Sequence, residues 1–181
     1  MLIVITGAPG AGKSTLVGVL ESEFNVTRVR PLTSRAARPT EVPPHNDYVH
    51  FGREDVAEAI RTGEIAFHDE VAGELYGVRK ADLVEEGKHR SVILPAGRIP
   101  DVERYAHTIP FFLSPPGGEA ELERRLRMRG ENDESVARRM DWGRIDTAAL
   151  RRERVWHLGA GSPLELATEV MRVVELESVV G

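Results

Sequence analysis

The stretch that decides the fold is GAPGAGKST, which occupies Gly7–Thr15. It agrees with the pattern G-x-x-x-x-G-K-[ST], the phosphate-binding P-loop, at every specified position. Glycines in such a loop let backbone N–H groups approach phosphate oxygens, and the positive end of the following helix faces the same oxygens. The pattern also assigns Lys13 to the β- and γ-phosphates of a nucleotide and the Ser14 hydroxyl to Mg²⁺. The predicted nucleotide-binding residues are Gly7, Ala8, Pro9, Gly10, Ala11, Gly12, Lys13, Ser14 and Thr15.

The residues on either side of this loop have the order that a P-loop needs. Leu2–Thr6 is a short apolar run rich in β-branched residues, which predicts a buried strand. Ser14–Glu23 carries Leu16, Val19 and Leu20 at helical spacing, which predicts a helix. A chance glycine-rich turn would explain the glycines, but not a lysine and a serine placed between a strand and a helix.

The composition is that of one globular domain. The chain has 181 residues, 41% hydrophobic and 29% charged, with a net charge of −5. A negative net charge argues against nucleic acid as a partner. The absence of cysteine excludes disulfides and favours a reducing compartment, so we expect a cytoplasmic protein. The N-terminal apolar run is too short for a signal peptide, and no stretch approaches the ~20 apolar residues of a membrane helix, so we expect no membrane partner.

Apolar runs alternate with amphipathic segments along the chain. Further strands are predicted at Val26–Arg30, Ser91–Leu94, Ile109–Leu113 and Arg154–Leu158. Further helices are predicted at Arg53–Thr62, Glu119–Met128, Glu134–Leu150 and Pro163–Leu176. Strands that alternate with helices form a parallel sheet covered by helices on both faces. The predicted fold is therefore the three-layer α/β fold of P-loop NTPases.

Two stretches interrupt this alternation, and we interpret both as mobile insertions in a single domain that spans residues 1–181. The first, 33–80, is long and polar, and the second, 127–139, carries arginines around Gly130. The core would then consist of residues 1–32, 81–126 and 140–181. Insertions that close over the substrates suit phosphoryl transfer, because this reaction must exclude water.

The arginines of the second insertion, the predicted lid, are candidates for charge neutralisation. Phosphoryl transfer spreads negative charge over three equatorial oxygens, which cations stabilise. Arg129 and Arg139 flank a predicted turn, so we assign both to catalysis together with Lys13. The alternative is a solvated helix face paired with acidic neighbours, and this explains Arg127 and Arg138 better.

Beyond the P-loop, the chain resembles the guanylate kinase family as far as Arg139. The similar segments are Thr33–Pro39 (family pattern T-T-R-x-x-R-x), Glu41-Val42 with Asp47-Tyr48 (G-E-V…D-Y), Gly73–Gly77 (G-x-x-Y-G), Leu122–Gly130 (L-x-x-R-L-x-x-R-G) and Glu134–Arg139 (E-x-I-x-x-R). One such segment would be weak evidence, whereas all of them in order after an intact P-loop are strong. The resemblance implies an ATP-dependent kinase that uses Mg²⁺ and a small phosphorylated acceptor.

The resemblance also implies a phosphate clamp, which makes the segment 33–80 an acceptor-binding lobe. The family holds the acceptor phosphate with two arginines and two tyrosines, and Arg35, Arg38, Tyr48 and Tyr76 match those positions. The chemistry agrees, because arginine offers a planar fork to phosphate and a tyrosine hydroxyl adds an oriented donor. Taken alone, each tyrosine would be explained equally well as a half-buried aromatic residue.

Base recognition departs from the family. Where the family reads guanine with Glu, with Ser or Thr, and with Asp, this chain has Phe67, Val78 and about Gly97. An unpaired buried polar group costs roughly 1–3 kcal/mol, so GMP would be a poor acceptor unless a residue of His68–Glu70 restores the contacts. The alternative is that this tripeptide, His68, Asp69 and Glu70, is a solvated loop.

The metal site departs from the family as well. The family has an Asp in the strand that here ends at Ile93–Arg98, where this chain has no carboxylate. Ser14 is therefore the predicted protein ligand of Mg²⁺, with phosphate and water completing the shell and Glu41 as an indirect helper.

A second family with this fold, the ribose 1,5-bisphosphate phosphokinases, is similar at other positions. These are Ala66–His68, the apolar residue after Tyr76-Gly77, Ala96–Arg98 and Leu164–Ala167. Arg98 is then either a ligand of a second acceptor phosphate or a surface arginine.

These patterns predict a P-loop kinase that moves the γ-phosphoryl group of ATP to the phosphate of a small acceptor. A nucleoside monophosphate, GMP or one with a variant base, is the leading acceptor, and a sugar phosphate such as ribose 1,5-bisphosphate is the alternative. A noncatalytic guanylate-kinase-like binding module is a third interpretation, which the intact P-loop opposes. A regulatory GTPase would need an N-K-x-D motif, and the sequence has none.

Overall fold

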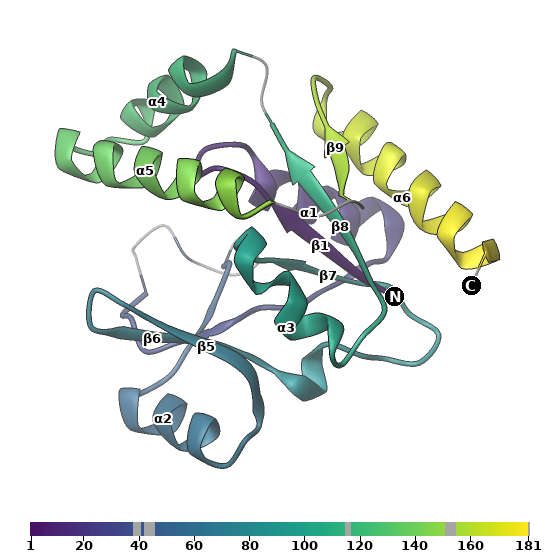
Figure 1. Ribbon diagram of the computed structural model, residues 1–181, viewed down its shortest axis with the longest axis horizontal. Helices are drawn as coiled ribbons and strands as arrows, with labels where there is room; N and C mark the ends of the chain where they lie inside the picture. Colours follow the sequence, from purple (N-terminus) through teal and green to yellow (C-terminus); the bar gives the residue numbers. More distant parts are fainter. Residues whose placement is uncertain (38–40, 42–45, 115–116, 151–154, 181) are drawn as a thin grey trace.

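The computed structural model spans residues 1–181 and describes all of them except 38–40, 42–45, 115–116, 151–154 and 181. The main sheet has five parallel strands in the order β2-β7-β1-β8-β9. Their bounds are β1 Leu2–Thr6, β2 Thr27–Arg28, β7 Arg90–Ile93, β8 Thr108–Leu113 and β9 Trp156–Leu158. The sheet confirms the predicted α/β fold, and strand β1 lies at its centre (Figure 1).

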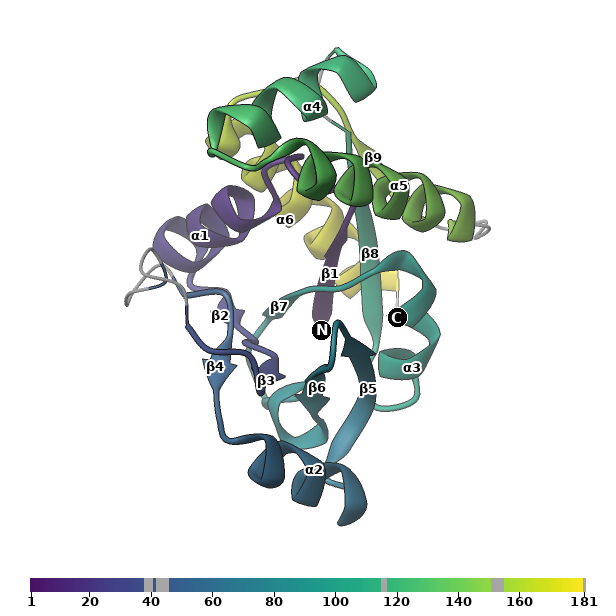
Figure 2. The ribbon, with the colours of Figure 1, turned by 90° about the vertical axis from the view of Figure 1, so that its left-hand side faces the viewer.

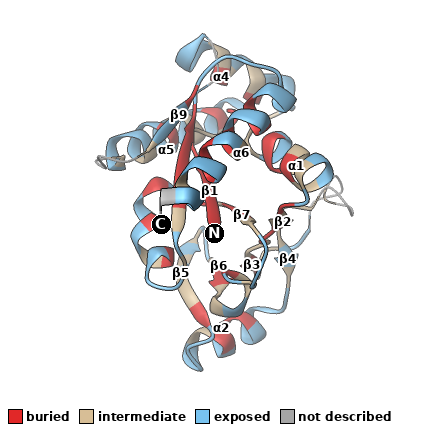
Figure 3. Ribbon diagram, turned by 90° about the vertical axis from the view of Figure 1, so that its right-hand side faces the viewer, coloured by how far each residue is buried: buried red, intermediate tan, exposed pale blue. Residues whose placement is uncertain are grey.

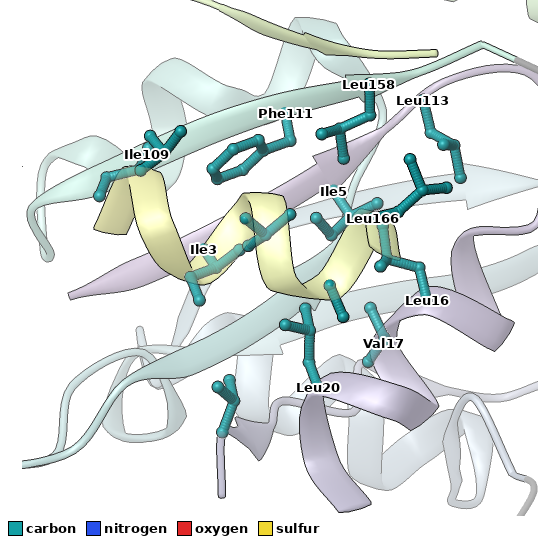
Figure 4. Packing of buried hydrophobic residues seen from close by; sticks show 14 of the residues in the cluster. Ile3, Ile5, Leu16, Val17, Leu20, Ile109, Phe111, Leu113, Leu158 and Leu166 are labelled. Carbon is teal, nitrogen blue, oxygen red and sulfur yellow. The ribbon is translucent and has the colours of Figure 1, made fainter. Parts of the chain in front are cut away.

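Strand β1 is buried along its whole length because helices cover both faces of the sheet. On one face, Ile3 and Ile5 pack with residues of α1 (Lys13–Phe24) and α6 (Pro163–Val180), as Figure 4 shows. On the other face, Leu2 and Val4 belong to a second apolar cluster that includes α3 (Ile99–Glu103). This alternation gives the three layers, and the buried residues concentrate along the central strands (Figure 3).

The segment 33–80 folds around a second sheet with the order β4-β3-β6-β5. Its bounds are β3 Leu32–Thr33, β4 Val49–His50, β5 Ile65–Val71 and β6 Glu74–Arg79, with α2 Arg53–Arg61 below the sheet (Figure 2). Strands β5 and β6 form an antiparallel hairpin. Both residues of its turn, Ala72 and Gly73, have positive φ (53° and 80°), as a two-residue hairpin turn of type I′ requires. The sequence predicted only α2 in this segment.

Helices α4 (Gly118–Met128) and α5 (Asp133–Ala149) form a helical hairpin near the carboxyl ends of the main strands (Figure 1). Asn132 caps α5, since its side chain accepts a hydrogen bond from the Ser135 backbone N–H at 2.9 Å. The predicted helices are all present, with ends shifted by a few residues. The short helix α3 was not predicted, and the strand predicted at Val26–Arg30 is reduced to β2.

Candidate active site

The P-loop connects β1 to α1 with a backbone that only glycine adopts easily. Gly7 and Gly12 have φ values of 133° and 103°. A Cβ atom on Gly7 would lie 2.4 Å from the carbonyl oxygen of Leu113, so the loop needs glycine there to pass β8. Gly12 is the N-cap of α1 and has no side chain that would occupy the first N–H groups of the helix. These groups are therefore available to an anion.

Lys13 folds back over the loop that precedes it. Its Nζ donates hydrogen bonds to the carbonyl oxygens of Gly7 at 2.6 Å and Ala8 at 2.9 Å. Burial lowers the pKa of Lys13 to about 8; the Asp146 carboxylate opposes this shift, while Arg129 and Arg139 add to it. Arg129 and Arg139 therefore each lie within electrostatic range of Lys13, where a polyphosphate would neutralise the three cations.

Ser14 contacts a carboxylate that comes from the segment 33–80. Its Oγ donates a hydrogen bond to Oδ2 of Asp47 at 2.8 Å, and Asp47 also forms an ion pair with the buried Arg28. Hydroxyl and carboxylate oxygens are the ligand types that Mg²⁺ takes. Among the described residues, no group of three or more His, Cys, Asp or Glu side chains could hold a metal ion. The donor set thus fits an ion that keeps most of its shell from phosphate and water.

A second carboxylate, Asp146 of α5, lies at the carboxyl ends of two neighbouring strands. It accepts hydrogen bonds from Oγ1 of Thr6, at 3.1 Å, and from the backbone N–H of Ala96. Thr6 ends β1, and Ala96 follows β7. A helix therefore brings a carboxylate to the region where the sequence has none on the strand itself. Sequence reasoning missed both Asp47 and Asp146 because only the tertiary fold brings them to the P-loop.

The two arginines assigned to catalysis differ in their surroundings. Arg139 is half-buried, and its Nε forms an ion pair with Glu131 at 2.6 Å. Arg129 is exposed, and no carboxylate of the described ranges forms an ion pair with it. Arg127 forms an ion pair with Glu123 at 2.9 Å on the surface of α4, which confirms its interpretation as a solvated helix face.

Three of the four predicted clamp residues lie together in the lobe. The guanidinium of Arg35 lies 5.6 Å from the ring centre of Tyr48, and the rings of Tyr48 and Tyr76 meet edge to face at 5.7 Å. Burial raises the pKa of Tyr48, and the neutral tyrosine hydroxyl can donate a hydrogen bond. Arg35 also pairs with Glu41 at 2.7 Å. The fourth residue, Arg38, lies outside the described residues.

Of the positions expected to contact a base, some lie in the core and others are exposed on the surface. Val78 is buried in the apolar cluster against which Phe67 packs, so it fills the core. Asp69 lies on the same face of β5 as Phe67, because the two are two residues apart in a strand. His68 and Glu70 are exposed on strand β5. Asp69 is therefore the member of the tripeptide that the structure turns toward Phe67.

Asp69 is paired with Arg98 of the core. Nε of Arg98 lies 3.1 Å from Oδ2 of Asp69, and Nη1 lies 3.3 Å from Asp101. The same guanidinium lies 5.7 Å from the centre of the Phe67 ring. Arg98 is thus a half-buried arginine with two carboxylate partners. Its two aspartate partners give this group of side chains a net negative charge.

A P-loop that follows the central strand of a parallel sheet, next to a lid with arginines and a lobe with a cation and two tyrosines, defines a P-loop kinase. No family model matches the chain. The guanylate kinase of Chlamydia abortus is 30% identical over 179 residues, which cover 96% of this chain and 86% of that protein. The guanylate kinase of Thermosynechococcus vestitus is 36% identical over 156 residues, which cover 82% of this chain and 80% of its own. The chain belongs to the guanylate kinase family.

Solved structures agree on the fold. The crystal structure of guanylate kinase from Anaplasma phagocytophilum matches with a TM-score of 0.67 and 21% identity, covering 98% of this chain and 85% of that chain. That of TT1252 from Thermus thermophilus matches with a TM-score of 0.53 and 18% identity, covering 98% and 97%. Among the helices that the structure describes, none has the length and apolar character needed to cross a membrane.

Proposed function

We propose that this kinase transfers the γ-phosphoryl group of ATP to the phosphate of GMP. The P-loop would bind the triphosphate of ATP, and the lobe formed by residues 33–80 would bind GMP. The observation that carries the proposal is a P-loop of fully matching sequence whose Lys13 lies within electrostatic range of Arg129 and Arg139. The naming of the relatives as guanylate kinases supports GMP as the acceptor.

Catalysis would rest on position and charge. The attacking oxygen belongs to a phosphate and is already anionic, so the reaction needs no general base. Lys13, Arg129 and Arg139 would neutralise the charge that develops on the transferring group. Ser14 and Asp47 are the residues that would hold Mg²⁺, which would supply positive charge against the phosphates of the nucleotide. The lid, residues 127–139, would exclude water from the transfer.

The acceptor phosphate would bind between Arg35 and the two tyrosines, with Arg38 as a further ligand. The Tyr48 hydroxyl is protonated and offers a donor, and the Arg35 guanidinium offers a fork. A phosphate would compete with Glu41 for Arg35, because the carboxylate holds the same guanidinium. Acceptor binding is therefore expected to depend on how easily the ion pair between Arg35 and Glu41 is broken.

Guanine recognition would use Asp69 and Arg98 in place of the residues that the family uses. The Watson–Crick edge of guanine offers N–H donors, which a carboxylate accepts, and its O6 and N7 accept from arginine. Asp69 and Arg98 supply one group of each kind beside the ring of Phe67. A sugar bisphosphate is less well served, because its second phosphate would meet the net negative charge of Arg98 with its two aspartates.

A coupled ADP-release assay tests the proposal. Purified enzyme with ATP and Mg²⁺ is given GMP, AMP, ribose 5-phosphate or ribose 1,5-bisphosphate, and Lys13→Met serves as the inactive control. We expect turnover with GMP that exceeds turnover with AMP and with both sugar phosphates. Turnover with a sugar phosphate alone would overturn the acceptor, and ATP binding without any turnover would favour a noncatalytic module.

A further inference from the structure

One face of helix α5 lies along the P-loop and the ends of the central strands. Arg139, Gly143 and Asp146 follow one another at spacings of four and three residues, which places them on the same face of the helix. Figure 1 shows the C-terminal half of α5 passing the carboxyl end of β1. Any shift of this helix would therefore move Arg139 relative to Lys13.

Gly143 allows a close approach between α5 and the P-loop. It is buried, and a Cβ atom there would lie 2.9 Å from the Cβ of Ala8 and 3.5 Å from Cδ of Pro9. Glycine is a poor residue for the interior of a helix, so helix propensity does not explain its presence. The contact with Ala8 does explain it, because any larger residue would push the helix away from the loop.

Asp146 fixes the same helix one turn further on. Its two carboxylate oxygens accept from Thr6 on β1 and from Ala96 after β7, so one side chain joins α5 to two strands. Thr6 is fully buried, which gives the contact a rigid partner. Hydrogen bonds to a charged acceptor are stronger than those between neutral groups, so a carboxylate holds the helix better than an amide would.

We propose that Gly143 and Asp146 form a docking contact that sets the position of Arg139 beside the P-loop. Both are positioning residues, since they act through Arg139 rather than on the phosphates. The inference rests on the proposed function, in which Arg139 stabilises the transferring phosphoryl group. The inference adds that the position of Arg139 depends on the contact of Asp146, which lies two helical turns away on the side of α5 that faces the core.

Asp146→Asn tests this directly, because it keeps the shape of the side chain and removes its charge. We expect kcat to fall about tenfold, with a much smaller change in the KM for GMP, because misplacing a catalytic group affects mainly the transition state. In an Arg139→Ala background the same substitution should lower kcat by clearly less than tenfold, because the arginine that it positions is gone and only the loss of the Asp146 charge near Lys13 remains. Asp141→Asn, on the exposed side of the same helix, is the matched control and should match wild type.

Hydrogen exchange of residues 133–149 provides a readout that does not depend on activity. Asp146→Asn should speed exchange in α5, whereas Arg139→Ala and Asp141→Asn should leave it unchanged. Gly143→Ala should repeat the kinetic and exchange effects of Asp146→Asn, which guards against a defect peculiar to one variant.

The possible results distinguish a failure of the docking contact from a failure of the proposed function. An equal loss of kcat in both backgrounds, or unchanged exchange in Asp146→Asn, would overturn the docking contact alone. A wild-type kcat for Arg139→Ala would remove the role of that arginine in the proposed function, and the docking contact as its positioning device would fall with it.

Discussion

The P-loop and the segment 33–80 differ in how their cations are paired. The P-loop is one run of nine residues, Gly7–Thr15, whose donors come mainly from the backbone and whose lysine is bonded only to carbonyl oxygens among the described residues. Each described cation near the expected acceptor already has a carboxylate partner: Arg35 of this segment pairs with Glu41, and Arg98 of the core pairs with Asp69. Under the proposed function, the donor site is fixed by local backbone geometry, while the acceptor site is adjusted by countercharges.

The largest expected effect tests the P-loop side of this comparison. Lys13→Met should lower kcat by about 10³-fold, because it removes a cation from the transferring phosphate in a water-excluded site. The measurement is ADP release with GMP, with a thermal melt as the control for folding. A folded variant that keeps a rate near that of wild type would take Lys13 out of the mechanism.

The next largest effect is expected for the arginines of the lid, which test the P-loop side of the comparison further. Arg139→Ala and Arg129→Ala should each lower kcat by about 10²-fold, because each supplies charge to the transition state. Arg127→Ala is the matched control, since this arginine is paired with Glu123 on the surface of α4 and should cost less than about twofold. Comparable losses for all three would show that the lid acts through its overall charge.

The lobe is predicted to show a binding effect rather than a rate effect. Arg35→Ala should raise the KM for GMP by about 10- to 100-fold, as expected for the loss of a charge-assisted hydrogen bond, with little change in the KM for ATP. Arg61→Ala, an exposed arginine on α2, provides the comparison. If the KM values for ATP and GMP rose equally, Arg35 would not belong to an acceptor clamp.

The smallest effect concerns Asp47, which belongs to the lobe but contacts the P-loop. Asp47→Asn should weaken the binding of Mn²⁺ in the presence of ADP by about tenfold, because it removes a charged oxygen next to Ser14. Electron paramagnetic resonance of free Mn²⁺ measures this without reference to activity. Asp55→Asn on α2 is the control, and equal affinities for the two variants would place the metal away from Asp47.

The sequence predicted the parts of this molecule that are local. The strand, loop and helix around Lys13 follow from consecutive residues, and the alternation of strands and helices correctly gave a parallel sheet with two covered faces. The second sheet was missed because β3 and β4 contain two residues each, too short for a periodic signal. Strand β5 lacks the regular alternation of apolar and polar residues that predicts a strand. The charged Asp69 lies on the same face as Phe67, which packs against the core.

The carboxylates of the site could not be predicted for a different reason. Asp47 reaches Ser14 from 33 residues away, and Asp146 reaches Thr6 from 140 residues away, so no spacing in the sequence connects them. Asp146 does share a helix face with Arg139, a pattern readable from a spacing of seven residues. That pattern gains a meaning only when the fold shows which face of α5 meets the P-loop.

The central claim is that one phosphoryl group passes from the nucleotide at the P-loop to the phosphate held at Arg35. The direct measurement is ³¹P NMR of the products formed from GMP and ATP labelled with ¹⁸O in its γ-phosphoryl group. We predict one labelled β-phosphate in GDP for each ADP released. ADP released with the label only in inorganic phosphate would contradict the claim, because the group would then pass to water.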